Sequence, residues 1–153
     1  MVNDLLKGKR GIIFGALNSQ SIAWKVAQRA HEEGATFVLT NAPIAMRMGE
    51  IKNLAEETGS EIIPADATSI EDLENLVTQS MEILGGKIDF VLHSIGMSPN
   101  VRKGKHYTEN DYRYYGQTMD VSAISFHKTL ATLYKHDAMS EWGSVLALSY
   151  IAA

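Results

Sequence analysis

Two segments of the chain carry side chains that could take part in chemistry. Ser149 and Tyr150 follow the apolar run 145–148, and His93 and Ser94 follow a second apolar run. A tyrosine hydroxyl in this position could hydrogen-bond a polarised carbonyl, or the ring could merely pack there. The His-Ser pair suggests a base and a nucleophile. Adjacent strand residues point to opposite faces, however, and this disfavours a hydrolytic role.

A third segment, residues 15–23, could bind a phosphate group. Gly15 permits a close approach of a ligand to the backbone. Ser21 could cap the following helix and donate a hydrogen bond to an anion at its positive end. Only one glycine is present, so the G-x-G-x-x-G pattern of dinucleotide-binding loops is not matched. Spacing alone therefore leaves open both a phosphate site and an ordinary connection between a strand and a helix.

Three further positions bear on a nucleotide ligand. Asn41 and Ala42 stand where an acidic residue would bind an adenosine ribose, and no Arg is directly adjacent, since Arg47 comes five residues later. This position slightly favours NAD over NADP. Asp66 could accept a hydrogen bond from an adenine amino group, or it could cap the turn into the next helix. Gly96 would allow a cofactor close to the backbone.

Each of these segments follows a short apolar run, and the runs alternate with segments of helical period. Most runs are continuously apolar, which is typical of parallel strands covered on both faces. Right-handed β-α-β connections then predict an α/β fold, a Rossmann-type doubly wound parallel sheet with strand order 3-2-1-4-5. Ligands of such sheets bind beyond the carboxyl ends of the strands, where the candidate residues fall. The predicted strands are 11–14, 36–39, 61–63, 88–92 and 144–148.

Helical periodicity predicts the elements that cover the sheet. The first helix is expected to end near Gly34, where a C-terminal cap belongs. Ser69 and Asp72 resemble a capping box that begins another helix, and residues 108–135 could hold two more. The first helix is predicted to bury Ile22, Ala23, Val26, Ala27 and Ala30. The helix after Ser69 is predicted to bury Leu73, Leu76, Val77 and Leu84.

Length and composition limit the classes of protein. The 153 residues, with 45% hydrophobic side chains, suit one domain that spans 1–153. A net charge of −4 argues against a nucleic-acid partner, and the lack of cysteine excludes disulfides, thiol catalysis and Cys-ligated zinc. The sequence has no closely spaced His and carboxylate residues of the kind that would indicate a metal site. No run approaches the roughly 18 apolar residues of a membrane span, and the first residues do not resemble a signal peptide. We therefore expect a cytoplasmic protein without a membrane partner.

Taken together, the strand-end motifs resemble one family. The chain is similar to the bacterial NADH-dependent enoyl-[acyl-carrier-protein] reductases of the short-chain dehydrogenase/reductase superfamily. Ordinary members of the superfamily have a Gly-rich first turn and an Asn-Asn-Ala-Gly-like fourth strand end, whereas Ser-Ile-Ala and His-Ser-Ile-Gly single out the enoyl reductases. The resemblance covers all 153 residues but only somewhat over half of a full-length member. The matching motifs are Gly15-x5-Ser21-Ile22-Ala23, Asp66-Ala67, His93-Ser94-Ile95-Gly96 and Leu148-Ser149-Tyr150.

The resemblance implies cofactor-binding roles for the matched positions. The first group would hold the pyrophosphate and the adjoining ribose, the second the adenine, and the third would line the path to the nicotinamide. In that order they are Gly15, Ser21 and Ile22; Asp66 and Ala67; Ile95 and Gly96. Ala42 falls where many members have a Gln near the adenosine ribose, so the chain departs from the family pattern there.

The resemblance also implies a reaction. Such enzymes use NADH to reduce the 2,3 double bond of a trans-2-enoyl thioester on acyl carrier protein, in type II fatty acid biosynthesis, and they assemble as homotetramers. Ser98 would lie at the edge of the substrate, and Tyr150 matches the first of two active-site tyrosines. The second Tyr, and the Lys seven residues after it, are missing, and so are further strands of the sheet. We therefore expect this N-terminal part to be inactive by itself.

Two alternatives remain at this point. Another reductase of the superfamily, such as a ketoacyl reductase, would use a Ser near this position, and Ser149 keeps that reading open. The other alternative is a non-catalytic dinucleotide-binding domain that is complete as it stands. The missing Tyr-x6-Lys pattern would be natural in such a protein.

Overall fold

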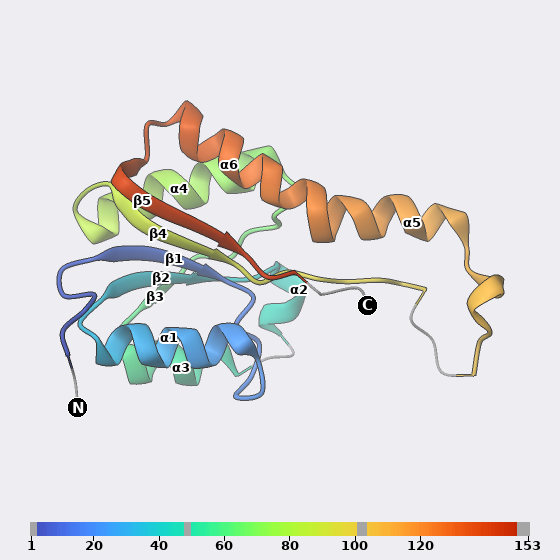
Figure 1. Ribbon diagram of the computed structural model, residues 1–153, viewed down its shortest axis with the longest axis horizontal. Helices are drawn as coiled ribbons and strands as arrows, with labels where there is room; N and C mark the ends of the chain where they lie inside the picture. The colour runs from blue at the N-terminus through green and yellow to red at the C-terminus, as the bar shows by residue number, and fades with distance from the viewer. Residues whose placement is uncertain (1–2, 48–49, 101–103, 150–153) are drawn as a thin grey trace.

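The computed structural model describes residues 3–47, 50–100 and 104–149. Tyr150 therefore lies outside the described residues. Within them, parallel strands form one sheet in the order β3-β2-β1-β4-β5 (Figure 1), and this confirms the predicted α/β class and strand order. The strands are β1 Arg10–Phe14, β2 Thr36–Thr40, β3 Glu61–Ile62, β4 Ile88–His93 and β5 Met139–Ala147.

Helices cover both faces of the sheet (Figure 1). On one face lie α1 (Ile22–Glu32) and α3 (Ile51–Thr58), and on the other lie α4 (Ile70–Leu84) and α6 (Ser125–Lys135). Successive side chains of β1 point to opposite faces, so Ile13 packs against the α1 side, whereas Ile12 and Phe14 pack against the α4 side. Apolar side chains of β1 are therefore buried on both faces of the sheet, as the sequence predicted for most of the strands.

Helix α1 buries Ala23, Trp24, Ala27 and Ala30. The predicted stripe was wrong at its edges, because Ile22 is 62% exposed and Val26 is 36% exposed. Three small alanines let the helix lie close to the sheet, and Trp24 fills the remaining space in place of the two branched side chains. The predicted C-terminal cap is confirmed. Gly34, with φ +87°, donates its N–H to His31, and the Ala35 N–H reaches the carbonyl of Ala30.

Helix α4 begins at the predicted cap. The hydroxyl of Ser69 accepts a hydrogen bond from the N–H of Asp72 at 3.2 Å. The returning half of a capping box is displaced, because the Asp72 carboxylate accepts from the N–H of Asp66 instead. The predicted face is confirmed for Leu73, Leu76 and Val77, which are buried, while Leu84 is partly buried against the same core.

Residues 112–135 form two helices joined without a break. These are α5 (Tyr112–Met119) and α6, separated by the π-helical segment η2 (Asp120–Ile124). In Figure 1, α5 extends well beyond the sheet. The remaining short elements are α2 (Pro43–Met46) and the 3₁₀ turn η1 (Tyr107–Glu109). None of the helices in the described ranges has the length and apolar character needed to cross a membrane.

Strand β5 differs from the predicted strand in extent. It begins at Met139, five residues before the expected start, and its register to β4 shifts between Ile88 and Phe90. Val145 packs against the core, but Leu146 is 61% exposed. Leu146 therefore lies exposed at the edge of the described sheet.

Candidate functional site

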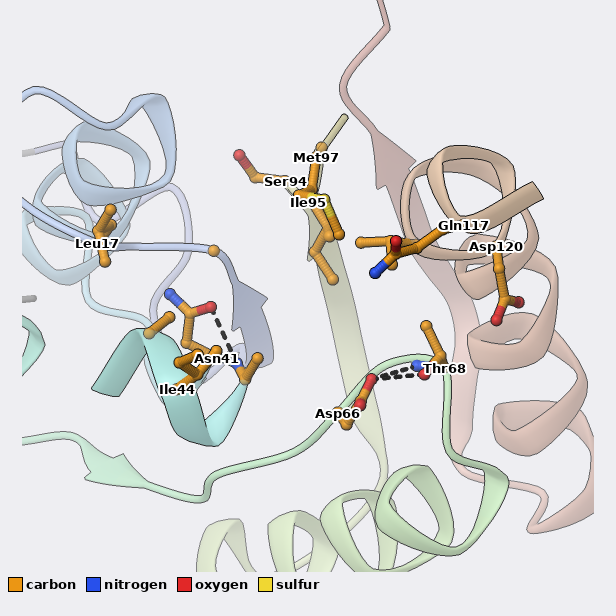
Figure 2. Close-up of a pocket in the computed structure, with 15 residues that line it drawn as sticks. Leu17, Asn41, Ile44, Asp66, Thr68, Ser94, Ile95, Met97, Gln117 and Asp120 are labelled. Carbon is orange, nitrogen blue, oxygen red and sulfur yellow. Dashed lines mark hydrogen bonds between the residues drawn. The ribbon is translucent and has the colours of Figure 1, made fainter. Parts of the chain in front are cut away.

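A pocket of about 680 Å³ opens where the carboxyl ends of the strands meet (Figure 2). This volume lies within the usual range of small-molecule sites. The position is the one predicted for a doubly wound sheet, at the switch between β1 and β4. The pocket is lined by Gly15, Leu17, Asn41, Ala42, Ile44, Ala45, Asp66, Thr68, Ser94, Ile95, Gly96, Met97, Gln117, Asp120 and Val121.

Gly15 closes the pocket at the end of β1. Its φ is +86°, and a Cβ added to it would lie 1.9 Å from the carbonyl oxygen of Ser94. Its N–H donates to the carbonyl of Thr40 at 3.1 Å. The glycine is thus required by the contact between the ends of β1 and β4, independently of any ligand. Sequence reasoning had considered only the approach of a ligand.

Ser21 occupies the N-cap position of α1, but its side chain does not cap the helix. Its hydroxyl turns back and accepts hydrogen bonds from the N–H groups of Leu17 and Asn18, each at 3.1 Å. The predicted capping bond was therefore wrong, because the loop uses the hydroxyl to satisfy its own backbone donors. Neither Ser21 nor Ile22 is among the residues that line the pocket. Their role toward a phosphate stays a prediction.

The end of β2 contributes Asn41 and Ala42 to the pocket wall. The side-chain oxygen of Asn41 accepts from the N–H of Ala42 at 2.9 Å, a bond drawn in Figure 2. Pro43 follows as the first residue of α2 and fixes the direction of the chain. Arg47, beyond α2, is exposed and lines a separate surface hollow together with Lys52.

Asp66 both supports a turn and lines the pocket. One carboxylate oxygen accepts hydrogen bonds from the N–H and the hydroxyl of Thr68, at 2.9 and 2.7 Å (Figure 2). The turn-capping alternative is confirmed by these bonds. An adenine contact is compatible with the same position and stays a prediction. Ala67 points into the core, where it is 6% exposed, and does not line the pocket.

Gly96 and Ile95 extend the pocket beyond β4. A Cβ added to Gly96 would meet no described atom within 4 Å, so the protein leaves open space above this backbone. A cofactor ring could approach the backbone there, and this role of Gly96 stays a prediction. Ile95 lies half-buried between the pocket and the α4 side of the core.

His93 and Ser94 do not form a nucleophile and base. His93 is 2% exposed, and its Nε2 lies 2.8 Å from the hydroxyl of Ser125 on α6. That hydroxyl donates to the carbonyl of Val121, so Nε2 must carry the proton that Ser125 accepts. Burial lowers the pKa of His93, and the imidazole is neutral. The hydrolytic alternative that the sequence disfavoured has no support in this geometry.

Three hydroxyls on one helical face fasten the loop after β4. Thr118, Ser122 and Ser125, which we call the hydroxyl seam, are spaced four and three residues apart. Ser122 accepts from the N–H of residue 97 at 3.0 Å and donates to its carbonyl at 3.1 Å. The hydroxyl of Thr118 donates to that of Ser98 at 3.2 Å. Ser98 is not among the residues that line the pocket, and its role at the substrate's edge stays a prediction.

The seam spans the π-helical segment, and such segments frequently occur at functional sites. Residues of α5 and η2 reach the pocket as Gln117, Asp120 and Val121. Sequence reasoning missed all three, together with the seam. The one available signal was the helical spacing of hydroxyl residues at 118, 122 and 125. In the part of the chain that the structure describes, no group of three His, Cys, Asp or Glu side chains is placed to hold a metal ion.

The order of the parallel strands and the pocket at their switch point define a Rossmann-like fold. The family profile described as "Enoyl-(Acyl carrier protein) reductase" matches residues 15–153. The chain belongs to this enoyl-(acyl carrier protein) reductase family within the short-chain dehydrogenase/reductase superfamily.

Curated relatives agree with this assignment. Enoyl-[acyl-carrier-protein] reductase [NADH] 1 of Rhizobium meliloti is 34% identical over 153 residues, which cover 99% of this chain and 54% of the relative. The FabI enzyme of Rickettsia bellii is also 34% identical, over 100% of this chain and 57% of its own length. The chain thus spans about half the length of the curated relatives it matches.

Solved structures extend the comparison. The FabI–NADH complex from Alistipes finegoldii has a TM-score of 0.92 and 62% identity, over 96% of this chain and 52% of that one. The enoyl-(acyl-carrier-protein) reductase of Anaplasma phagocytophilum in complex with NAD has a TM-score of 0.82 and 28% identity, over 95% and 55% of the two chains. Similar proteins have therefore been crystallised with the oxidised and the reduced dinucleotide.

Proposed function

We propose that the full-length protein uses NADH to reduce the 2,3 double bond of a trans-2-enoyl thioester carried by acyl carrier protein. The observation that carries the proposal is the convergence of predicted cofactor positions on one pocket of a chain of this family. Five of the eight positions line it: Gly15, Ala42, Asp66, Ile95 and Gly96.

The residues divide between binding and catalysis. The open backbone at Gly96 would receive the nicotinamide end, and Asp66 would receive the adenine. When bound, NADH supplies the hydride for the β-carbon of the enoyl group. Tyr150, which lies outside the described residues, is proposed to donate a hydrogen bond to the thioester oxygen, where negative charge develops.

NADH is proposed over NADPH because neither Asn41 nor Ala42 offers a positive charge to a 2′-phosphate. The family is not uniform in this respect, since the enoyl-acyl carrier protein reductase of Bacillus cereus was crystallised with NADP+. Titration of both cofactors into the full-length protein tests the choice. Tenfold tighter binding of NADPH, about 1.4 kcal/mol, would reverse it.

Turnover of an enoyl thioester, followed by the loss of NADH absorbance, tests the reaction itself. Tyr150→Phe is expected to lower kcat about 10²-fold and to leave the Kd for NADH unchanged, because the hydroxyl serves the substrate. Tyr134→Phe is the matched control, since that ring lies on α6, is 89% exposed and does not line the pocket. Unchanged kinetics in Tyr150→Phe would assign Tyr150 to packing, and NADH binding without turnover would leave a non-catalytic dinucleotide-binding domain.

A homotetramer is the assembly that we propose for the full-length protein, on the strength of the family resemblance. Helix α5, which extends well beyond the sheet, is a surface that an assembly could cover (Figure 1). The mass of the full-length protein in solution tests this proposal, and a monodisperse monomer would contradict it.

A further inference from the structure

We propose that Lys128 is a positioning residue for the adenine end of the pocket, which it controls by tying the loop after β3 to the helix η2. The inference rests on the proposed function only in that the ligand is a dinucleotide. It does not depend on the reaction that follows binding.

The ammonium group of Lys128 joins two parts of the pocket wall. Its Nζ donates to the carbonyl oxygen of Thr68 and to a carboxylate oxygen of Asp120, each at 2.8 Å. Thr68 and Asp120 both line the pocket, and they come from separate elements, as Figure 2 shows. Lys128 itself comes from α6 and is not among the lining residues. It therefore acts on the pocket through its two partners.

The burial of this lysine distinguishes it from the surface ion pairs of the chain. Its side chain is 23% exposed, whereas that of Lys135, which lies two turns further along the same helix and pairs with Glu74, is 65% exposed. Exposed pairs contribute little, because solvent screens them and the free side chains gain entropy. A partly buried ammonium that also donates to a backbone carbonyl is held more firmly. Lys128 is accordingly a fixed strut, and Lys135 is its exposed counterpart.

The strut bears on the residue predicted to bind adenine. The carbonyl of Thr68 accepts the hydrogen bond from Lys128. The N–H and the hydroxyl of the same Thr68 donate to the carboxylate of Asp66. The other side-chain bonds described for this loop are local, such as that from the N–H of Asp66 to Asp72. Local bonds shape the turn but do not set its distance from the opposite wall. Lys128 sets this distance, because it bonds the carbonyl of Thr68 from a position 60 residues later in the sequence.

Lys128→Met in the full-length protein tests the inference. We expect the Kd for NADH and for ADP-ribose to rise about three- to tenfold, because a charge-assisted tie to the adenine loop is lost. We expect kcat at saturating NADH to stay within about twofold of wild type, since Lys128 contacts Thr68 and Asp120 and none of the residues proposed to take part in the reaction. Lys135→Met makes the same chemical change on the same helix and should leave both affinities unchanged.

Two further variants keep the test decisive. Lys128→Arg retains a donor that can span the partners and should recover most of the affinity, which a purely steric role would not give. Asp120→Asn keeps the shape of the carboxylate but weakens the ion pair, and it carries the test if Lys128→Met does not fold. An expected two- to threefold rise in Kd from Asp120→Asn supports the strut.

The outcomes separate this inference from the proposed function. Wild-type affinities in both Lys128→Met and Asp120→Asn would overturn the role of Lys128, whether or not the enzyme turns over. A loss of kcat with unchanged affinity for ADP-ribose would also overturn it. Absence of enoyl reduction, with NADH binding that still depends on Lys128, would reject the proposed function alone. Absence of any NADH binding by the wild type would reject both.

Discussion

The two walls of the pocket are built in different ways. In the first wall, residues 15–17 and 41–45, side-chain hydrogen bonds stay within one loop, as in the bond from the N–H of Leu17 to Ser21, four residues away. Contacts between its loops run through the backbone, as from the Gly15 N–H to the Thr40 carbonyl. The second wall, residues 94–97 and 117–121, is held by side chains that are 20 to 32 residues apart, among them His93 and Ser125. The first wall is a property of the loops that follow β1 and β2. The second exists only once the helix of residues 112–135 has docked.

This difference predicts how substitutions act. A change in the first wall should disturb the backbone at its own position, because the wall has little else to adjust. A change in the hydroxyl seam should instead separate two elements that remain intact individually. We expect the largest loss of stability where the backbone around the substituted residue cannot move.

Gly15→Ala should have the largest effect. The added Cβ would lie 1.9 Å from the carbonyl oxygen of Ser94, and the φ of +86° is unfavourable for any L-residue. Strain and overpacking together should lower the free energy of unfolding by about 2–5 kcal/mol. Chemical denaturation of the full-length protein measures this loss.

Gly59→Ala is the control for Gly15→Ala. Its φ is +63°, but a Cβ there would meet nothing within 4 Å, so only the conformational cost of about 1–2 kcal/mol applies. Equal losses in the two variants would show that the contact with Ser94 relaxes without cost. The first wall would then be less rigid than its geometry indicates.

Ser125→Ala should break the second wall at a smaller cost. It leaves the Nε2–H of His93 and the carbonyl of Val121 without the hydroxyl that now serves both. Buried groups left unpaired should reduce the free energy of unfolding by about 1–3 kcal/mol. Ser80→Ala is the matched control, because that buried hydroxyl has no hydrogen-bond partner among the described residues. A loss of the same size in Ser80→Ala would assign the effect to packing alone.

The same contrast explains how far the sequence could predict this molecule. The strand order followed from the alternation of strands and helices along the whole chain, and the cap at Ser69 and the pocket residues Gly15, Ala42 and Asp66 followed from strand ends and helix starts. The hydroxyl seam and Lys128 did not, because their partners are distant in sequence and a lone Ser or Lys on a helix carries no signal of what it contacts. Prediction succeeded where structure is local or is fixed by the topology of parallel strands.

Two errors have physical reasons of the same kind. Ser21 was expected to cap α1, but its loop competes for the hydroxyl, and composition cannot reveal which donor prevails. Strand β5 was predicted from its apolar run 144–148, yet it begins at Met139, because pairing with β4 and not apolarity alone decides where the strand starts.

Asp66→Asn should have a modest and selective effect. The amide retains an oxygen that can accept from Thr68, so the turn is preserved, while the other carboxylate oxygen is replaced by a donor. If Asp66 accepts from the adenine amino group, the affinity for NADH should fall by about 1 kcal/mol, or roughly fivefold. The melting temperature without cofactor should not change. Unchanged NADH affinity would leave Asp66 with its turn-capping role alone.

The smallest expected effect is a pH dependence at His93. Burial lowers the pKa of this imidazole below its value of about 6.5 in an unfolded chain. The unfolded state therefore takes up the proton first, and stability falls as the pH drops from 6.5 toward the lowered pKa of the folded state. Between pH 7.0 and 6.0 a single such group accounts for about 0.7 kcal/mol at most.

The partly buried carboxylate of Asp89 does not contribute to this decline. The pKa of Asp89 is also lowered: burial raises it, but the hydrogen bond from the Arg10 N–H and its other polar contacts outweigh burial. Its contribution is therefore lost only as the pH falls below the unfolded value near 4. Melting curves at pH 7.0 and 6.0 should show the decline in the wild type and a flatter response in His93→Gln, whose amide can still donate to Ser125. An equal decline in both proteins would place the titrating group elsewhere, and the second wall would then lack the neutral, buried His93–Ser125 pair that distinguishes it from the first.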